Sequence, residues 1–227
     1  MQQSYRALRI IAEAQTIRIV LAPEPDDLML KELSVFCDSL QTESSSGIKA
    51  VVLDFNPTAT QLVTGGSQAS AAHTATIVSS TCAATHAINQ PVLAVVRATL
   101  SQSACLLLKA ADFTLVAENA GLMISDEEEG ILTGLQAFRL GFVTWAASVH
   151  DINKHMERVL DLLRTKSAIA LRHTKASVRL AHANHTTTLE ALEKVNQLYL
   201  TQLMQTHDAH EGLQAFLEKR KPNWKNI

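Results

Sequence analysis

The chain of 227 residues contains 47% hydrophobic residues and carries a formal net charge of −2. Its length and hydrophobic content fit one large domain, or one domain with a helical appendage, and the lack of a basic excess argues against binding to nucleic acid or to an anionic membrane surface. No segment has the length and apolar character of a membrane span, and the N-terminus lacks the long apolar core of a secretory signal. We therefore expect a soluble, cytoplasmic protein.

The three cysteines, Cys37, Cys82 and Cys105, are far apart in the sequence and lie in apolar or helical surroundings. Such residues are usually buried free thiols of a reducing compartment. No cluster of cysteines and histidines has the spacing of a metal site, so no metal is expected.

The first quarter of the chain alternates between predicted strands and helices. An apolar strand is predicted at Thr16–Leu21, and Asp26 is placed to cap a helix that runs to about Thr42. A buried strand is predicted at 48–55. This β-α-β alternation predicts an α/β fold with largely parallel strands.

A loop that starts at Asn56 ends in the turn 64–67, which contains two glycines. Glycine permits positive φ angles and close approach of the backbone to a ligand. The helix predicted after this turn runs to about Ile88 and is rich in Ala, Ser and Thr, so its helix propensity is mixed.

The segment from Gln90 to Gly134 places the start of a helix directly after a buried strand. The strand is predicted at Val92–Val96, a small polar turn follows at 99–102, and Ser103 is placed to cap a helix at 104–111. This arrangement directs backbone N–H groups at whatever lies over the helix N-terminus, which suits a carbonyl oxygen that gains negative charge. The remaining predicted elements are strands at 113–116 and 122–124, an acidic loop at 126–129, and helices at 153–165, 167–181, 187–205 and 208–219.

The same segment resembles the core of the crotonase (enoyl-CoA hydratase/isomerase) superfamily. The matching pieces are, in chain order, Gln90-Pro91-Val92, Ala111-Asp112, Ala117-Glu118-Asn119-Ala120, Thr174-Lys175, 208–212 and 215–222. The two tail pieces are the most specific, and the turns that would carry catalysis match least well. The resemblance implies an α/β fold of the crotonase type, a spiral of ββα units over residues 1–145, followed by a C-terminal helical region at 146–227 that serves oligomerisation and covers the site.

The chain resembles a divergent and shortened member of this family. Residues 134–143 match a step that family members reach only after a helical segment, and most of that segment is missing here. In the family it walls one side of the acyl pocket.

The resemblance also implies catalytic roles. The backbone N–H groups of Gly66 and Ser103 would form an oxyanion hole for a thioester enolate. The first carboxylate of the family's hydratases falls on Leu106, which cannot move a proton, and the second falls on Asp126. Hydration with two carboxylates is therefore disfavoured, whereas isomerisation or a lyase step would need only Asp126. The alternative is that Asp126 belongs to a solvated acidic loop with its neighbours 127–129.

Four further residues are expected to bind substrate. Gln68 could hydrogen-bond a carboxylate, and His73 follows on the same helix, with an ordinary surface position as its alternative. Tail lysines of the family reach the phosphates of CoA, often in a neighbouring subunit, which implicates Lys219 and Lys221; a solvated helix end is the alternative. Trp224 could pack as a C-terminal anchor. No cofactor is implied beyond the CoA or phosphopantetheine of the substrate.

Three functions stay open at this point. The first is an isomerase or lyase that acts on an acyl-CoA or acyl-carrier-protein thioester. The second is a decarboxylase of the kind found in polyketide β-branching, in which the oxyanion hole alone drives loss of CO2. The third is a non-catalytic structural or regulatory subunit. In each case the resemblance implies a homotrimer or a dimer of trimers.

Overall fold

The computed structural model describes residues 5–42, 47–62, 71–124, 130–182 and 188–226 of the chain. Within these residues one sheet has the strand order β1-β2-β3-β4-β5-β8, and β1 alone runs antiparallel to its neighbour. The strands are β1 (Arg9–Glu13), β2 (Thr16–Leu21), β3 (Ala50–Phe55), β4 (Val92–Val96), β5 (Phe113–Ala117) and β8 (Trp145–Ala147). The predicted α/β fold with largely parallel strands is confirmed.

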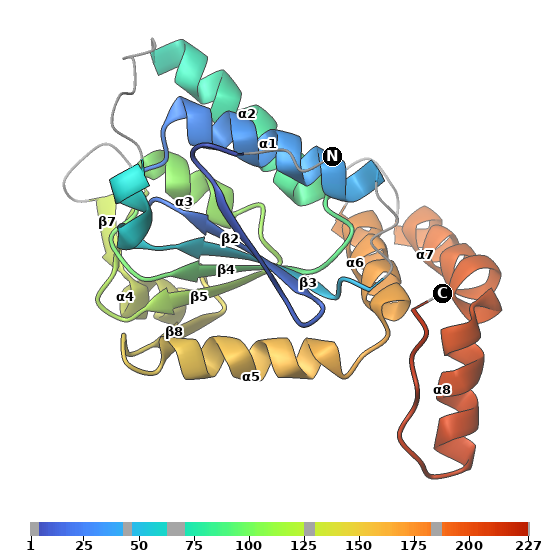
Figure 1. Cartoon of the computed structure of the whole chain (residues 1–227). Helices are drawn as coiled ribbons and strands as arrows, with labels where there is room; N and C mark the ends of the chain where they lie inside the picture. Colours follow the sequence, from blue (N-terminus) through green and yellow to red (C-terminus); the bar gives the residue numbers. More distant parts are fainter. Residues whose placement is uncertain (1–4, 43–46, 63–70, 125–129, 183–187, 227) are drawn as a thin grey trace.

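The two central strands explain why the sequence reads as continuous apolar runs. Every residue of β3 and of β4 is buried, because helices cover both faces of the sheet. In Figure 1, α1 (Asp27–Thr42), α2 (Ala71–Ala87) and α3 (Gln102–Leu108) lie on one face, and α5 (Ile152–Arg164) lies on the other. A 3-10 helix, Pro57–Leu62, follows β3.

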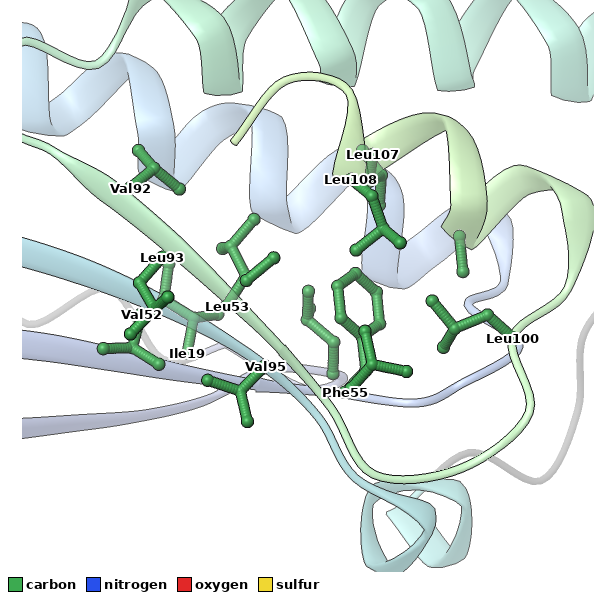
Figure 2. Close-up of a cluster of buried hydrophobic side chains, with 14 of the residues drawn as sticks. Ile19, Val52, Leu53, Phe55, Val92, Leu93, Val95, Leu100, Leu107 and Leu108 are labelled. Atoms are coloured by element: carbon green, nitrogen blue, oxygen red, sulfur yellow. The ribbon is translucent and has the colours of Figure 1, made fainter. Parts of the chain in front are cut away.

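The main core lies between the sheet and the first group of helices. Figure 2 shows Leu107 and Leu108 of α3 in one buried cluster with Phe55 of β3 and Leu100 of the turn before α3. Phe55, Leu100 and Leu107 are completely buried. At roughly 1.5–3 kcal/mol for each large side chain, this burial fixes α3 firmly on the sheet.

A small second sheet lies in the chain between β5 and β8 of the main sheet. It pairs β6 (Gly121–Met123) antiparallel with β7 (Ile131–Thr133), and α4 (Gly134–Arg139) begins at once. Thr133 and Gln136 form a capping box at the start of α4. A Cβ atom on Gly134 would lie 2.2 Å from the carbonyl oxygen of Ala117, so only glycine permits this close approach.

The described residues after α5 are largely helical, as predicted, and lie to one side of the sheet (Figure 1). The helices are α6 (Ala168–His182), α7 (Thr188–Gln197), a π-helical turn (Leu198–Gln202), a 3-10 turn (Leu203–Gln205) and α8 (His207–Leu217). The single helix predicted at 187–205 is therefore a composite of three geometries. In the described part of the chain, every helix is too short or too polar to cross a bilayer. The division into residues 1–145 and 146–227 stays a prediction.

The structure corrects the start of α3 and adds strands. Ser101, not Ser103, caps the helix, which begins at Gln102 and ends at Leu108. The turn is shorter than predicted because Leu100 is drawn into the core and bridges to Leu122. Strands β1, β7 and β8 were not predicted, since each is short or only partly buried and so lacks a strong apolar run.

Candidate active site

The N-terminus of α3 presents unpaired backbone donors. The side chain of Ser101 accepts a hydrogen bond from the Ala104 amide at 3.4 Å and lies 3.2 Å from the hydroxyl of Ser103. Within the described residues, no acceptor pairs with the amide N–H of Gln102 or of Ser103. The first amides of a helix have no partner inside the helix, so these two groups are free to bind an oxygen that carries negative charge.

Several hydrogen bonds fix the turn between β4 and α3. The Leu100 amide donates to the Gly121 carbonyl at 2.8 Å, and the Gly121 amide donates to the Thr99 hydroxyl at 3.1 Å. The Ser101 amide donates to the Pro23 carbonyl at 3.1 Å. The turn is thus held by β6 and by the loop after β2, which sets the direction of the helix start.

An apolar hollow of about 100 Å³ lies beside α3. It is lined by Cys105, Leu108, Lys109, Leu122, Ile124, Leu132, Ala137, Phe142 and Val143. Ile124 and Phe142 at this hollow are 52% and 67% exposed. Burial raises the pKa of the Cys105 thiol to about 11, so this lining group is a neutral thiol near pH 7.

No carboxylate stands on α3 where the resemblance to hydratases would place one. Leu106 occupies that position and is 41% exposed. This helix can therefore supply backbone donors but no acid or base from residue 106.

The structure describes only part of the predicted site. Gly66, Gln68 and Asp126 lie outside the described residues. His73 lies in the first turn of α2, and nothing is described of its side chain. Ser103 lies in the first turn of α3, as needed for its amide to serve as a donor.

The tail places Lys219 and Lys221 on the surface beyond the end of α8. Arg220, which lies between them, is held by Glu211 at 2.6 and 3.0 Å and by Glu218 at 2.6 Å. The hydrogen bonds from Arg220 and from the Asn223 amide hold the pKa of Glu211 well below its ordinary value, at about 2. Lys219 and Lys221 form no ion pair within the described residues, so both ammonium groups are available to an anionic ligand.

The tail pieces that resemble the family have a structural role. Asp208 is buried and accepts hydrogen bonds from the Ser167 hydroxyl at 2.6 Å and from the Lys225 amide at 2.8 Å. The Trp224 indole donates to the Thr165 carbonyl at 2.8 Å and packs against Gly212, where a Cβ atom would lie 3.3 Å from the ring. The expected anchoring by Trp224 is confirmed.

Sequence reasoning missed a buried ionic network in the sheet. Asp54 of β3 is completely buried; its carboxylate accepts from the Arg97 Nε at 2.6 Å and from the Arg18 Nε at 2.9 Å. A guanidinium nitrogen of Arg97 also lies 4.0 Å from the sulfur of Met156 in α5, which places the network on the α5 side of the sheet. The sequence feature that could have indicated this network was an aspartate inside an otherwise apolar strand.

Residues 132–226 match the family model described as enoyl-CoA hydratase/isomerase. A 102-residue stretch is 35% identical to the cyclohexa-1,5-dienecarbonyl-CoA hydratase of Thauera aromatica; it covers 42% of this chain and about a third (36%) of that protein.

Solved structures agree in fold over nearly the whole chain. An enoyl-CoA hydratase of Bacillus anthracis superposes with a TM-score of 0.77 at 20% identity, over 97% of this chain and 100% of that one. An enoyl-CoA hydratase/isomerase of Mycobacterium paratuberculosis gives 0.77 at 16% identity, over 99% and 100%. The chain therefore has the fold of these enoyl-CoA hydratases, and its C-terminal part is similar to the enoyl-CoA hydratase/isomerase family.

The chain diverges from the family it resembles at the positions that matter for chemistry. The region that matches the family model begins at residue 132, after both α3 and the acidic loop. The described part therefore combines the fold and tail of these structures with a helix α3 that carries Ser103 and Leu106, where the resemblance to hydratases implies a glycine and a carboxylate.

Proposed function

We propose that the protein is an enzyme of the enoyl-CoA hydratase/isomerase type that acts on an acyl thioester. The observation that carries this proposal is the pair of free amides at the start of α3, on Gln102 and Ser103, beside an apolar hollow. In the proposed mechanism the amides of Ser103 and Gly66 bind the thioester oxygen. Donors fixed before the reaction stabilise the enolate more than the substrate, and this difference lowers the barrier.

Isomerisation or a lyase step fits the site better than hydration. Addition of water needs an acid and a base, and Leu106 supplies neither. Asp126 would take a proton from one carbon of the acyl group and return it to another, which isomerises a double bond without change in oxidation state. The absence of a carboxylate at residue 106 also suits a decarboxylase, in which the enolate forms as CO2 leaves.

The acyl group would occupy the hollow beside α3. Leu108, at its lining, lies five residues after Ser103, which is about 7.5 Å along a helix. A six-carbon acyl group spans a similar length. The relative's name specifies a thioester of a six-carbon ring with a carbonyl carbon, and an apolar hollow of about 100 Å³ is compatible with a compact group of this class.

The carrier would be bound through its phosphates. Lys219 and Lys221 are unpaired in the described part of the chain and lie on the same short tail segment. Phosphates of CoA, or the phosphopantetheine of a carrier protein, would attract both. We further propose that the protein assembles as a homotrimer or a dimer of trimers, because Phe216 and Leu217 of α8 are 81% and 79% exposed and such side chains favour burial.

Two measurements test the proposal. Calorimetry should detect binding of acetyl-CoA and tighter binding of hexanoyl-CoA, and Leu132→Phe, which narrows the hollow, should reduce only the gain from the longer chain. Asp126→Asn should abolish isomerase turnover at an unchanged melting temperature, while Glu128→Gln in the same acidic loop should keep it.

Other results point to the other functions. Loss of CO2 from a malonyl-type thioester that survives Asp126→Asn would identify the decarboxylase. If the protein binds neither acyl-CoA nor acyl-carrier protein, the remaining function is that of a non-catalytic structural or regulatory subunit.

A further inference from the structure

The buried carboxylate of Asp54 joins β3 to the start of the turn that leads to Ser103. Asp54 lies in β3, one residue before that strand ends at Phe55, and the loop that follows leads to Gly66. Arg97 directly follows β4 and opens the turn that leads to Ser103. The contact of 2.6 Å between Arg97 Nε and Asp54 Oδ1 therefore links the end of β3 to the start of the turn after β4.

Burial and additional hydrogen bonds keep this contact rigid. The Asp54 side chain is 0% exposed and the Arg97 side chain is 13% exposed, so little water competes for the hydrogen bond. The backbone adds a second tie, because the Arg97 amide donates to the Phe55 carbonyl at 3.2 Å. Arg18 binds the other carboxylate oxygen from β2 and so holds Asp54 from the side away from the turn.

We propose that Asp54 and Arg97 are positioning residues, which hold the β4–α3 turn and so set the direction of the Ser103 amide. Neither side chain would touch the substrate, because both lie on the α5 side of the sheet and α3 lies on the opposite side (Figure 1). This proposal rests on the proposed function for its effect on ligand binding. Its effect on the turn itself does not depend on that function.

The structure offers a matched control for the test. Arg97→Met and Arg18→Met each remove one guanidinium from the same buried carboxylate, but only Arg97 belongs to the turn before α3. Arg97→Lys keeps a cation on the turn and tests rescue. Hydrogen exchange of the full chain would be followed at the Leu100, Ser101 and Cys105 amides, which are hydrogen-bonded in the turn and the first helical turn.

Arg97→Met should speed exchange at these three amides about tenfold or more, and Arg97→Lys should restore part of the protection. At a temperature at which each variant is folded, Arg97→Met should weaken hexanoyl-CoA binding about tenfold, whereas Arg18→Met should leave both the exchange at the turn and the affinity near those of the parent protein.

Equal effects of Arg97→Met and Arg18→Met would show a purely structural network and overturn the proposal. So would an unchanged rate of exchange in Arg97→Met. If the parent protein binds neither acetyl-CoA nor hexanoyl-CoA, the proposed function fails, and the exchange measurement still decides whether Arg97 holds the turn.

Discussion

The ammonium nitrogen of Lys175 lies 2.6 Å from a carboxylate oxygen of Asp112 and 2.9 Å from the carbonyl oxygen of Gln90. The same carboxylate oxygen of Asp112 accepts the Val92 amide at 2.7 Å. Helix α6 is thereby fastened to the start of β4 and to the loop before β5. The Thr174-Lys175 pair that resembles the family thus has a structural explanation in this chain.

Replacement of Lys175 should destabilise the protein. Lys175→Met would remove the ammonium group from the Asp112 carboxylate and one donor from the Gln90 carbonyl, at a cost of about 3 kcal/mol. Chemical denaturation measures this loss. Thr174→Ala, at the exposed neighbouring residue, serves as the control and should change stability by less than about 0.5 kcal/mol. Equal stability of the two variants would contradict the structural role of Lys175.

The buried thiol of Cys37 predicts a loss of stability at alkaline pH. Burial raises its pKa from the ordinary value of 9.0 to about 12, against a smaller opposing effect of the Thr85 hydroxyl. Above pH 9 the unfolded chain loses this proton while the folded chain keeps it, so the thiol's contribution falls as the pH rises from 9 towards 12. In Cys37→Ala the free energy of unfolding should fall less steeply with pH, with a slope smaller by at most about 1.4 kcal/mol per pH unit.

The measurement is the free energy of unfolding of the two proteins at several pH values between 7 and 11. Below pH 8 the difference between them should be constant. A parent protein and variant with parallel pH profiles up to pH 11 would show that Cys37 does not retain its proton.

The tail should loosen when Asp208 loses its charge. In Asp208→Asn the amide group replaces one acceptor, so either the Ser167 hydroxyl or a tail amide at Lys225 or Asn226 loses its partner. We expect a loss of about 2 kcal/mol and faster hydrogen exchange at residues 223–226. Glu218→Gln, which weakens an exposed ion pair with Arg220 and keeps an oxygen acceptor for Gln214, is the control and should leave that exchange unchanged.

A carboxylate on α3 should add the missing catalytic group. Leu106 is 41% exposed, so Leu106→Glu would fit with little change in stability. If Asp126 and the free amides work as proposed, this variant should gain measurable hydration of but-2-enoyl-CoA, and Leu106→Gln should not. The spectrophotometric loss of the conjugated double bond follows the reaction. Hydration at equal rates in Leu106→Glu and Leu106→Gln would show that the added carboxylate is not the cause of the activity.

Local patterns in the sequence were sufficient for the regular core. Thr16–Leu21 and Val92–Val96 form strands with the predicted bounds, and the Asp26 carboxylate accepts the Met29 amide at 2.8 Å, as expected of the residue before α1. These elements are continuous in sequence, so an apolar run, or a capping side chain a few residues from the amide that it accepts, is enough to predict them. The free state of the three cysteines is also confirmed, with Cys37 and Cys105 buried and Cys82 half-buried.

The candidate site was predictable only in outline. The sequence pattern predicted a helix start at Ser103. In the structure Ser101 is the N-cap, because Leu100 is buried in a core formed by distant strands. The predicted partners Gly66 and Asp126 lie outside the described residues, so their place opposite Ser103 stays a prediction.

The sequence by itself determined the crotonase resemblance, the order of strands and helices, and the lack of a carboxylate at residue 106. Only the tertiary structure decided how the buried charges pair, because Asp54 meets Arg18 and Arg97, and Lys175 meets Asp112, across long separations in the chain. A charge in a sequence has no partner until strands and helices pack, and the cost of burying it unpaired then selects the partner.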